Sequence, residues 1–307
     1  MGQQSYSEDM AKTREHKHIS PTAFGHIYFR SFYKIPLAAK MLAAMQGKSD
    51  NLAAYTENKA IIPIMEARYK GGEEAIEAYI REHPNAQIME LAAGFSLHGA
   101  TLAKKYPAID YFETDLPDIV AVKKEAIDVI IPIQLPNLHH VPANALDLEV
   151  LKNIAGTDQE RPLVIYNEGL MSYLTDAEKL QLADAVKGLL KNKAGVWITP
   201  DPALSAERRH GLAQLIPDSW KSGEKKVEEM TKQKYDDYVF RSEEAANEFF
   251  RENGFTVQTI PQPTELNSFD AISMNPEFAE KLKDNIKYHG KIWLLQLNKN
   301  NSQNYSE

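Results

Sequence analysis

The feature that most constrains the fold of this chain is a regular alternation of short apolar runs with helix-like segments. Each run has strand length, and most are followed by residues with helical spacing of their apolar side chains. This alternation predicts βαβ units and a parallel sheet that helices cover on both faces. We therefore expect an α/β fold with a doubly wound, mostly parallel sheet of seven strands. The expected strands are residues 87–91, 109–114, 138–141, 161–167, 195–199, 255–260 and 291–297. An amphipathic helix is expected over residues 175–191, with Thr175 as its N-cap.

Segments outside the alternation define the expected domains. Residues 1–83 read as a loose polar arm followed by a helical cap, with strong helix formers at Ala38–Met45. The sheet domain is expected over residues 84–298, with a charged helical insertion at about 203–250 and a polar tail at 299–307. The cap and the insertion fall where they could cover the carboxyl ends of the strands, the edge at which open α/β sheets bind ligands.

Composition narrows the classes of function. The 307 residues carry a formal charge of −8 and no run of Lys and Arg, so we do not expect a nucleic-acid partner. The absence of Cys excludes disulfides and Cys-ligated metals. No apolar stretch approaches the roughly 18 residues of a membrane span, and Met1–Lys17 is unlike a secretory signal. We expect a cytoplasmic protein that is not attached to a membrane.

The first candidate for chemistry is the turn after residues 87–91. Glu90 is followed by the small residues Ala92, Ala93 and Gly94 and then by a helix. Small residues let backbone N–H groups approach a ligand. The dinucleotide fingerprint is not met, because Ala92 replaces its first glycine. The alternative is an ordinary turn between a strand and a helix.

Acidic residues also mark the ends of three further strands. Asp115 lies 21 residues after Gly94, where nucleoside-binding folds accept a ribose diol. Glu113 shares its strand parity, but we expect only Asp115 to reach the crevice. Asp147, beside Leu148, could bond an adenine amine. For both Asp115 and Asp147 the alternative is a helix cap.

The fourth acid, Glu168, ends the strand of residues 161–167 beside Gly169, whose lack of a side chain permits close backbone approach. A surface acid at a strand end is the alternative. Four acids at four strand ends would repel a nucleotide phosphate and hold a ligand with ammonium, sulfonium and ribose groups. S-adenosylmethionine is a cofactor with these groups.

Three motifs, at residues 90–94, 111–117 and 167–174, resemble those of the leucine carboxyl methyltransferase family. The resemblance extends from Thr22 to Leu297 and is nearest to the bacterial O-methyltransferase-like members of this class I S-adenosylmethionine-dependent family. It implies a seven-stranded Rossmann-like methyltransferase sheet with an N-terminal helical segment and a helical lid.

The resemblance also implies roles for single residues. The turn would cradle the methionine part of the cofactor, and Glu168 would lie near its amino group. Arg68 is the best match to a family arginine that grips the methionine carboxylate, although Arg30 is also eligible. Ser96–His98 departs from the family pattern, which leaves the acceptor open. The implied cofactor-binding residues are Arg68, Glu90, Ala92, Gly94, Asp115, Leu116, Asp147, Leu148 and Glu168.

Candidates for a catalytic base or an aromatic contact are His98, His140 and Tyr173. A packing or solvated role is the alternative for His98. No metal site is expected, because the adjacent His139 and His140 would point to opposite faces of a strand.

Together these observations predict in-line O-methylation of a small-molecule carboxylate or hydroxyl by an S-adenosylmethionine-dependent enzyme. The alternatives are a protein carboxyl methyltransferase, a non-catalytic nucleoside-binding scaffold on the same fold, and a nicotinamide oxidoreductase. The last is disfavoured because short-chain nicotinamide oxidoreductases carry a Tyr-x-x-x-Lys pair well after their glycine turn. The only such pair in this sequence, Tyr55 with Lys59, precedes the turn. The residues do not indicate an oligomeric state.

Overall fold

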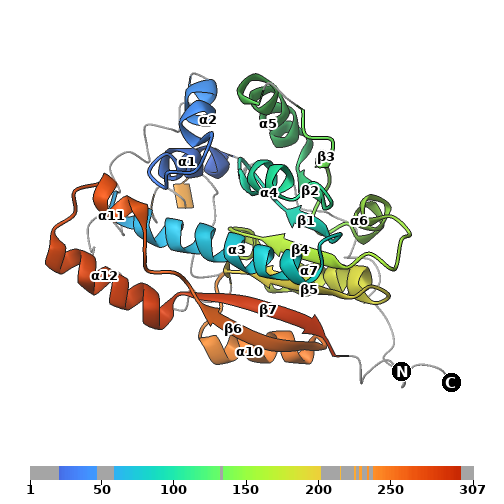
Figure 1. Ribbon diagram of the computed structural model, residues 1–307. Coiled ribbons are helices and arrows are strands. Elements are labelled where there is room, and N and C mark those ends of the chain that lie inside the picture. The colour runs from blue at the N-terminus through green and yellow to red at the C-terminus, as the bar shows by residue number, and fades with distance from the viewer. Residues whose placement is uncertain are drawn as a thin grey trace.

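The computed structural model describes residues 21–46, 59–131, 134–201 and 238–298, together with the single positions 215, 225, 228, 229 and 234. Its centre is a seven-stranded sheet in the order β3-β2-β1-β4-β5-β7-β6 (Figure 1). The strands are β1 Gln87–Leu91, β2 Asp110–Asp115, β3 Leu138–Pro142, β4 Leu163–Asn167, β5 Gly195–Thr199, β6 Phe255–Pro261 and β7 Lys291–Leu297. Strands β1 to β5 pair in parallel, whereas β7 runs antiparallel to both of its neighbours. The predicted mostly parallel sheet is therefore confirmed.

Helices cover both faces of the sheet. The face that carries Ile88 packs against α3 and α4, and the opposite face, which carries Met89, packs against α6, α7 and α10. Side chains of neighbouring strand residues point to opposite faces, so β1 is buried along its whole length. The helices are α1 Pro21–Arg30, α2 Ala38–Met45, η3 Lys59–Ile61, α3 Ile62–Glu82, α4 His98–Lys105, α5 Pro117–Ile130, α6 Leu148–Ala155, η4 Met171–Tyr173, α7 Asp176–Leu190, α10 Glu243–Glu252, α11 Asn267–Ala271 and α12 Pro276–His289.

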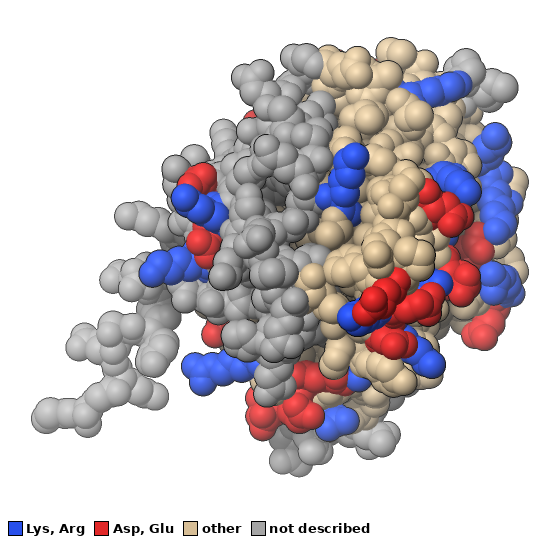
Figure 2. Space-filling view, turned by 90° about the vertical axis from the view of Figure 1, so that its left-hand side faces the viewer, with Lys and Arg blue, Asp and Glu red and all other residues tan. Residues whose placement is uncertain are grey.

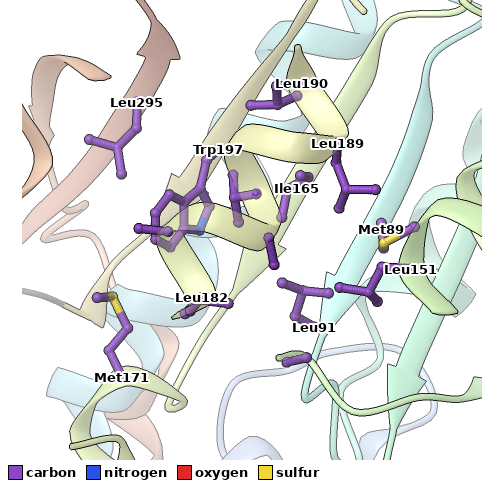
Figure 3. Close-up of a cluster of buried hydrophobic side chains, with 14 of the residues drawn as sticks. Met89, Leu91, Leu151, Ile165, Met171, Leu182, Leu189, Leu190, Trp197 and Leu295 are labelled. Atoms are coloured by element: carbon purple, nitrogen blue, oxygen red, sulfur yellow. The ribbon is translucent and has the colours of Figure 1, made fainter. Parts of the chain in front are cut away.

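The larger core cluster lies between the sheet and the helices α6, α7 and α10. Figure 3 shows Trp197 of β5 among aliphatic side chains from β4, α7 and β7. The indole of Trp197 is fully buried and contacts Phe250 edge-on, with a centroid distance of 5.3 Å. Each aromatic ring of this size removes 150–250 Å² from water, so this cluster is a main source of the stability of the sheet.

Local signals explain where the helices begin. The side chain of Thr175 accepts a hydrogen bond from the backbone of Glu178, and Glu178 bonds back to Thr175, which completes a capping box at the start of α7. The predicted N-cap is therefore confirmed. Pro117 opens α5, where a missing N–H has no consequence.

The N-terminal helices form a layer beside α5. Residues Ile27 of α1 and Met41 of α2 are buried against Ile127 of α5, and α1 and α2 lie next to α5 in Figure 1. The described residues 21–46 and 59–82 of this segment contain α1, α2 and α3, and their role as a cap stays a prediction, whereas the predicted arm at residues 1–17 lies outside the described residues.

The predicted insertion at 203–250 is described only at single positions and from residue 238 onward. Its last part, from Glu243, belongs to α10, whose Phe250 packs against Trp197 and Trp293. This part therefore covers the sheet rather than the carboxyl ends of the strands. The rest of the insertion and the tail at 299–307 lie outside the described residues.

Charges on the surface are mixed in sign. On the face drawn in Figure 2, acidic and basic side chains are intermingled. Opposite charges pair along α12, where Lys281 contacts Glu277 and Lys283 contacts Glu280. Among the described residues, no helix is both long and apolar enough to cross a bilayer.

Charged groups also lie inside the protein. Glu113 of β2 is 2% exposed and lies 2.7 Å from Lys123 Nζ and 3.0 Å from His140 Nε2. Burial opposes ionisation of Glu113, but the two neighbouring groups hold its pKa below the usual value. The cluster thus links α5 and the edge strand β3 to β2.

We predict that Lys123→Met lowers the free energy of unfolding at pH 7 by about 3 kcal/mol, because it leaves the Glu113 carboxylate buried without its cation. Urea denaturation measures this loss, and Lys124→Met, a change at an exposed position of the same helix, is the control. Because the pKa of Glu113 is lowered in the folded protein, its contribution is present above the unfolded pKa and is lost as the pH falls through the folded pKa. The difference between variant and wild type should therefore shrink below about pH 4. A difference that does not depend on pH would contradict this assignment.

Candidate functional site

A cavity opens at the carboxyl ends of β1, β2, β3 and β4, and α1 lies across it. Its empty space is about 950 Å³, part of which is continuous with solvent. Segments after four parallel strands form its floor and sides, which is the position that the sequence predicted for a ligand.

The turn after β1 depends on two backbone conformations of positive φ. Gly94 has φ +50° and Ala92 has φ +51°, and both residues line the cavity. The left-handed region costs an L-residue roughly 1–2 kcal/mol, whereas glycine adopts it readily. Ala92, which stands where the dinucleotide fingerprint has its first glycine, therefore adopts a conformation that suits glycine and adds strain to the turn.

Asp115, at the end of β2, is held by the turn. The backbone N–H of Gly94 donates to Oδ2 of Asp115 at 2.6 Å, and the N–H of Leu116 donates to Oδ1 at 2.7 Å. Burial raises the pKa of Asp115, and these two hydrogen bonds oppose the shift. No side chain caps α5, so the alternative role of Asp115 as a helix cap does not apply. Asp115 and Leu116 both line the cavity, and their role in cofactor binding stays a prediction.

The third wall comes from the loop after β4. Glu168, Gly169 and Tyr173 line the cavity, and Gly169 has φ +77°. The loop is held from below by Asp201, which follows β5. The carboxylate of Asp201 accepts hydrogen bonds from the backbone N–H groups of Gly169, Leu170 and Met171 at 2.6, 2.8 and 3.0 Å.

Asp201 was not among the residues that the sequence analysis selected. It is an acid two residues beyond the end of a strand, the same signal that singled out the other four acids. Its position just before the charged insertion hid this pattern. Its partners could not be deduced from the sequence, because they come from α3 and from the loop after β4.

The segment after β3 departs from the prediction. Asp147 caps α6, because its Oδ1 accepts a hydrogen bond from Val150 N at 3.1 Å, and its side chain is exposed. Neither Asp147 nor Leu148 lines the cavity. The wall here is formed by Ala143–Leu146. The capping alternative is thus confirmed for Asp147, and the adenine role stays a prediction without support from its position.

The two candidate arginines differ in position. Arg30 lines the cavity and lies 5.2 Å from the centre of the Tyr69 ring. Arg68 does not line it, and its Nη2 donates to Asp201 Oδ1 at 2.7 Å. The structure therefore presents the guanidinium of Arg30, rather than that of Arg68, to a ligand.

One histidine at the cavity escaped the sequence analysis. His26 lies one helical turn before Arg30 on α1, and both line the cavity. Burial and the nearby charges of Arg30 and Arg68 lower the pKa of His26 to about 3. The imidazole is thus neutral at physiological pH. The spacing of four residues between His26 and Arg30 on one helix face is the signal that could have found the pair.

The histidines that the sequence analysis proposed lie elsewhere. His98 is fully buried, stacks on Tyr69 at a ring-centroid distance of 3.7 Å, and lies 3.5 Å from Glu90. Burial opposes protonation of His98, but Glu90 raises its pKa above the usual value. His140 belongs to the cluster with Glu113. The packing alternative for His98 is confirmed, and neither histidine lines the cavity.

Glu90 also lies below the cavity rather than in its wall. Its Oε2 accepts a hydrogen bond from the hydroxyl of Tyr111 at 2.8 Å, and only 2% of the residue is exposed. Its predicted role in cofactor binding stays a prediction. Among the described residues, no group of three or more His, Asp or Glu side chains is placed to hold a metal ion.

Comparison with known proteins gives a family match. The family described as "Leucine carboxyl methyltransferase" matches residues 18–187. The curated protein Leucine carboxyl methyltransferase 1 of Kluyveromyces lactis is 25% identical over 155 residues, which cover 43% of this chain and 46% of that protein. The match thus spans about half the length of this curated relative.

Solved structures with a similar course of the chain include two methyltransferases. An O-methyltransferase family protein from Burkholderia thailandensis is 10% identical, with a TM-score of 0.47, and the match covers 90% of this chain and 72% of that one. An S-adenosylmethionine-dependent methyltransferase from Anabaena variabilis is 12% identical, with a TM-score of 0.47 and coverage of 80% and 94%.

We predict that Ala92→Gly raises the free energy of unfolding by about 1 kcal/mol, because glycine relieves the positive φ of this turn. Ala93→Gly is the matched control, since its φ is not positive and the change should lower stability by about 0.5–1 kcal/mol. Chemical denaturation of the two variants gives the comparison. Equal destabilisation by both would show that the turn is not strained at residue 92.

Proposed function

This chain belongs to the leucine carboxyl methyltransferase family, because the family match spans more than half of the residues of the chain. On this premise we propose that the protein binds S-adenosylmethionine and methylates an oxygen atom. The observation that carries the proposal is the cavity in which Asp115, Glu168 and Arg30 meet. These residues come from three separate segments of the chain.

The chemistry of the cavity fits the cofactor. Each oxygen of Asp115 accepts one backbone hydrogen bond and keeps a further lone pair, with which it can accept the two hydroxyls of a ribose. Glu168 offers a negative charge to an ammonium group, and Arg30 offers a guanidinium to a carboxylate. We assign these two residues to the two charged ends of the methionine part.

Methyl transfer needs alignment and the exclusion of water. The bound sulfonium would supply an activated methyl carbon for in-line attack by an acceptor oxygen. The chain supplies the apolar side chains of Phe95, Ile119 and Leu174 on the cavity wall, which keep water from the reacting groups. Tyr173 also lines the cavity and can present its ring face to a cation.

The titratable groups at the cavity favour a carboxylate acceptor. A hydroxyl acceptor requires a base whose pKa is near the working pH. His26, with a pKa of about 3, is too weak a base for this role. A carboxylate acceptor is already ionised and needs no base. We propose a small-molecule carboxylate, because the described residues frame a partly enclosed cavity.

The proposal predicts micromolar binding of S-adenosylhomocysteine and no binding of NAD in calorimetric titration. Asp115→Ala and Glu168→Ala should each weaken the affinity about 10- to 100-fold, because each removes a charge-assisted contact. Asp118→Ala, a change at an exposed acid on α5, should leave the affinity unchanged. Failure of the wild-type protein to bind would refute the proposal, and full affinity in both cavity variants would refute the site. Binding without turnover on any carboxylate would favour the scaffold alternative.

A second prediction concerns pH. With a carboxylate acceptor, kcat/KM should be constant between about pH 6 and pH 8.5, since His26 stays neutral over this range. His26→Ala should leave the shape of this profile unchanged. Initial rates with labelled cofactor measure both profiles. A rise in rate with pH that disappears in His26→Ala would identify His26 as a base and would point to a hydroxyl acceptor.

A further inference from the structure

The carboxylate of Asp201 is the most densely hydrogen-bonded group described at the cavity. Its side chain is 1% exposed, and it lies below the loop that carries Glu168. Five N–H donors from three parts of the chain meet on it. They are Arg68 Nη2 at 2.7 Å, Asn167 Nδ2 at 2.7 Å, and the backbone N–H groups of Gly169 at 2.6 Å, Leu170 at 2.8 Å and Met171 at 3.0 Å.

This arrangement requires a carboxylate rather than any polar group. An ionised carboxyl group offers about four lone-pair sites and no donor, so it can face donors on every side. An asparagine at position 201 would turn its own NH₂ group toward some of these donors. The charge of Asp201 is balanced by Arg68, which makes the pair stable inside the protein. Because its acceptor sites are filled by the chain itself, Asp201 does not bind a ligand directly.

The donors connect Asp201 to the wall of the cavity. The three backbone N–H groups belong to the loop that brings Glu168 and Tyr173 to the ligand side. Asn167 extends the network, because its Oδ1 accepts a hydrogen bond from Trp197 Nε1 at 2.7 Å and its Nδ2 donates to Thr199 Oγ1 at 3.0 Å. The loop after β4 is thereby tied to β5 and to α3.

We propose that Asp201 is a positioning residue, which fixes the backbone of residues 169–171 so that Glu168 faces the ammonium group of the ligand, with Arg68 as its partner rather than as a ligand-binding residue. The inference rests on the proposed function for the identity of the ligand. It adds that the affinity supplied by Glu168 depends on a carboxylate that never touches the ligand.

The test is a double-mutant cycle of Asp201→Asn and Glu168→Ala, read as affinity for S-adenosylhomocysteine. We expect Asp201→Asn to weaken binding at least tenfold in the otherwise wild-type protein. In the Asp201→Asn background, Glu168→Ala should then cost less than threefold, because Glu168 is already misplaced. A purely structural role would leave the full effect of Glu168→Ala in both backgrounds, and that additivity would overturn the inference.

The controls separate positioning from a general loss of stability. Ser242→Ala removes the N-cap of α10, a helix that does not line the cavity, and so lowers stability away from the loop. Well below its melting temperature this variant should bind with wild-type affinity and show the full effect of Glu168→Ala. If Asp201→Asn does not fold, as judged by circular dichroism, Asp201→Glu replaces it in the same cycle. That variant keeps the charge and shifts the carboxylate by one methylene. Absence of binding by the wild-type protein would refute the proposed function itself, whereas additive effects with normal wild-type binding would refute only this inference.

Discussion

Backbone N–H groups in the loops beyond a parallel sheet have no neighbouring strand to accept their hydrogen bonds, and in this protein carboxylates accept them. Asp115 binds the turn after β1, and Asp201 binds the loop after β4. Glu66 of α3, which is fully buried, does the same for Asn267 and Ser268 at the start of α11. A buried N–H without an acceptor is costly, so each of these carboxylates holds the loop whose backbone donates to it in one conformation. The cavity has a defined shape because of these contacts.

The acids at the strand ends therefore divide into two kinds. Asp115 and Glu168 reach the cavity, whereas Glu90 and Glu113 are directed into the protein, where they meet Tyr111, His98, Lys123 and His140. Asp115 and Glu113 share strand parity, and the position of Asp115 at the strand end separated them, because only a residue there can leave the sheet. This argument could not separate Glu90 from the ligand-facing acids, since a buried tyrosine hydroxyl as partner has no signature in the sequence.

Much of the fold followed from the alternation of apolar runs, because side-chain period and segment length are local properties. The strands Gly195–Thr199 and Lys291–Leu297 have the predicted bounds, and the cap at Thr175 is present. The site was harder to predict where it depends on distant contacts. Asp201 and Arg68 are 133 positions apart, and His26 reaches the cavity because α1 packs against α2 and α3. Asp147 shows the opposite case. It fits the pattern of acids at strand ends, but its side chain has a local role as the cap of α6.

The position of α1 across the cavity has a consequence for the order of events during synthesis. The buried cluster that contains Ile27 of α1 is completed by Ile127 of α5, which is made about 100 residues later. At ribosomal rates this interval lasts roughly five seconds or more. During that time the apolar face of α1 lacks its partners on α5. The nascent chain thus exposes an apolar helix face until α5 emerges, and binding by a general chaperone at this stage would be a physical consequence of the topology.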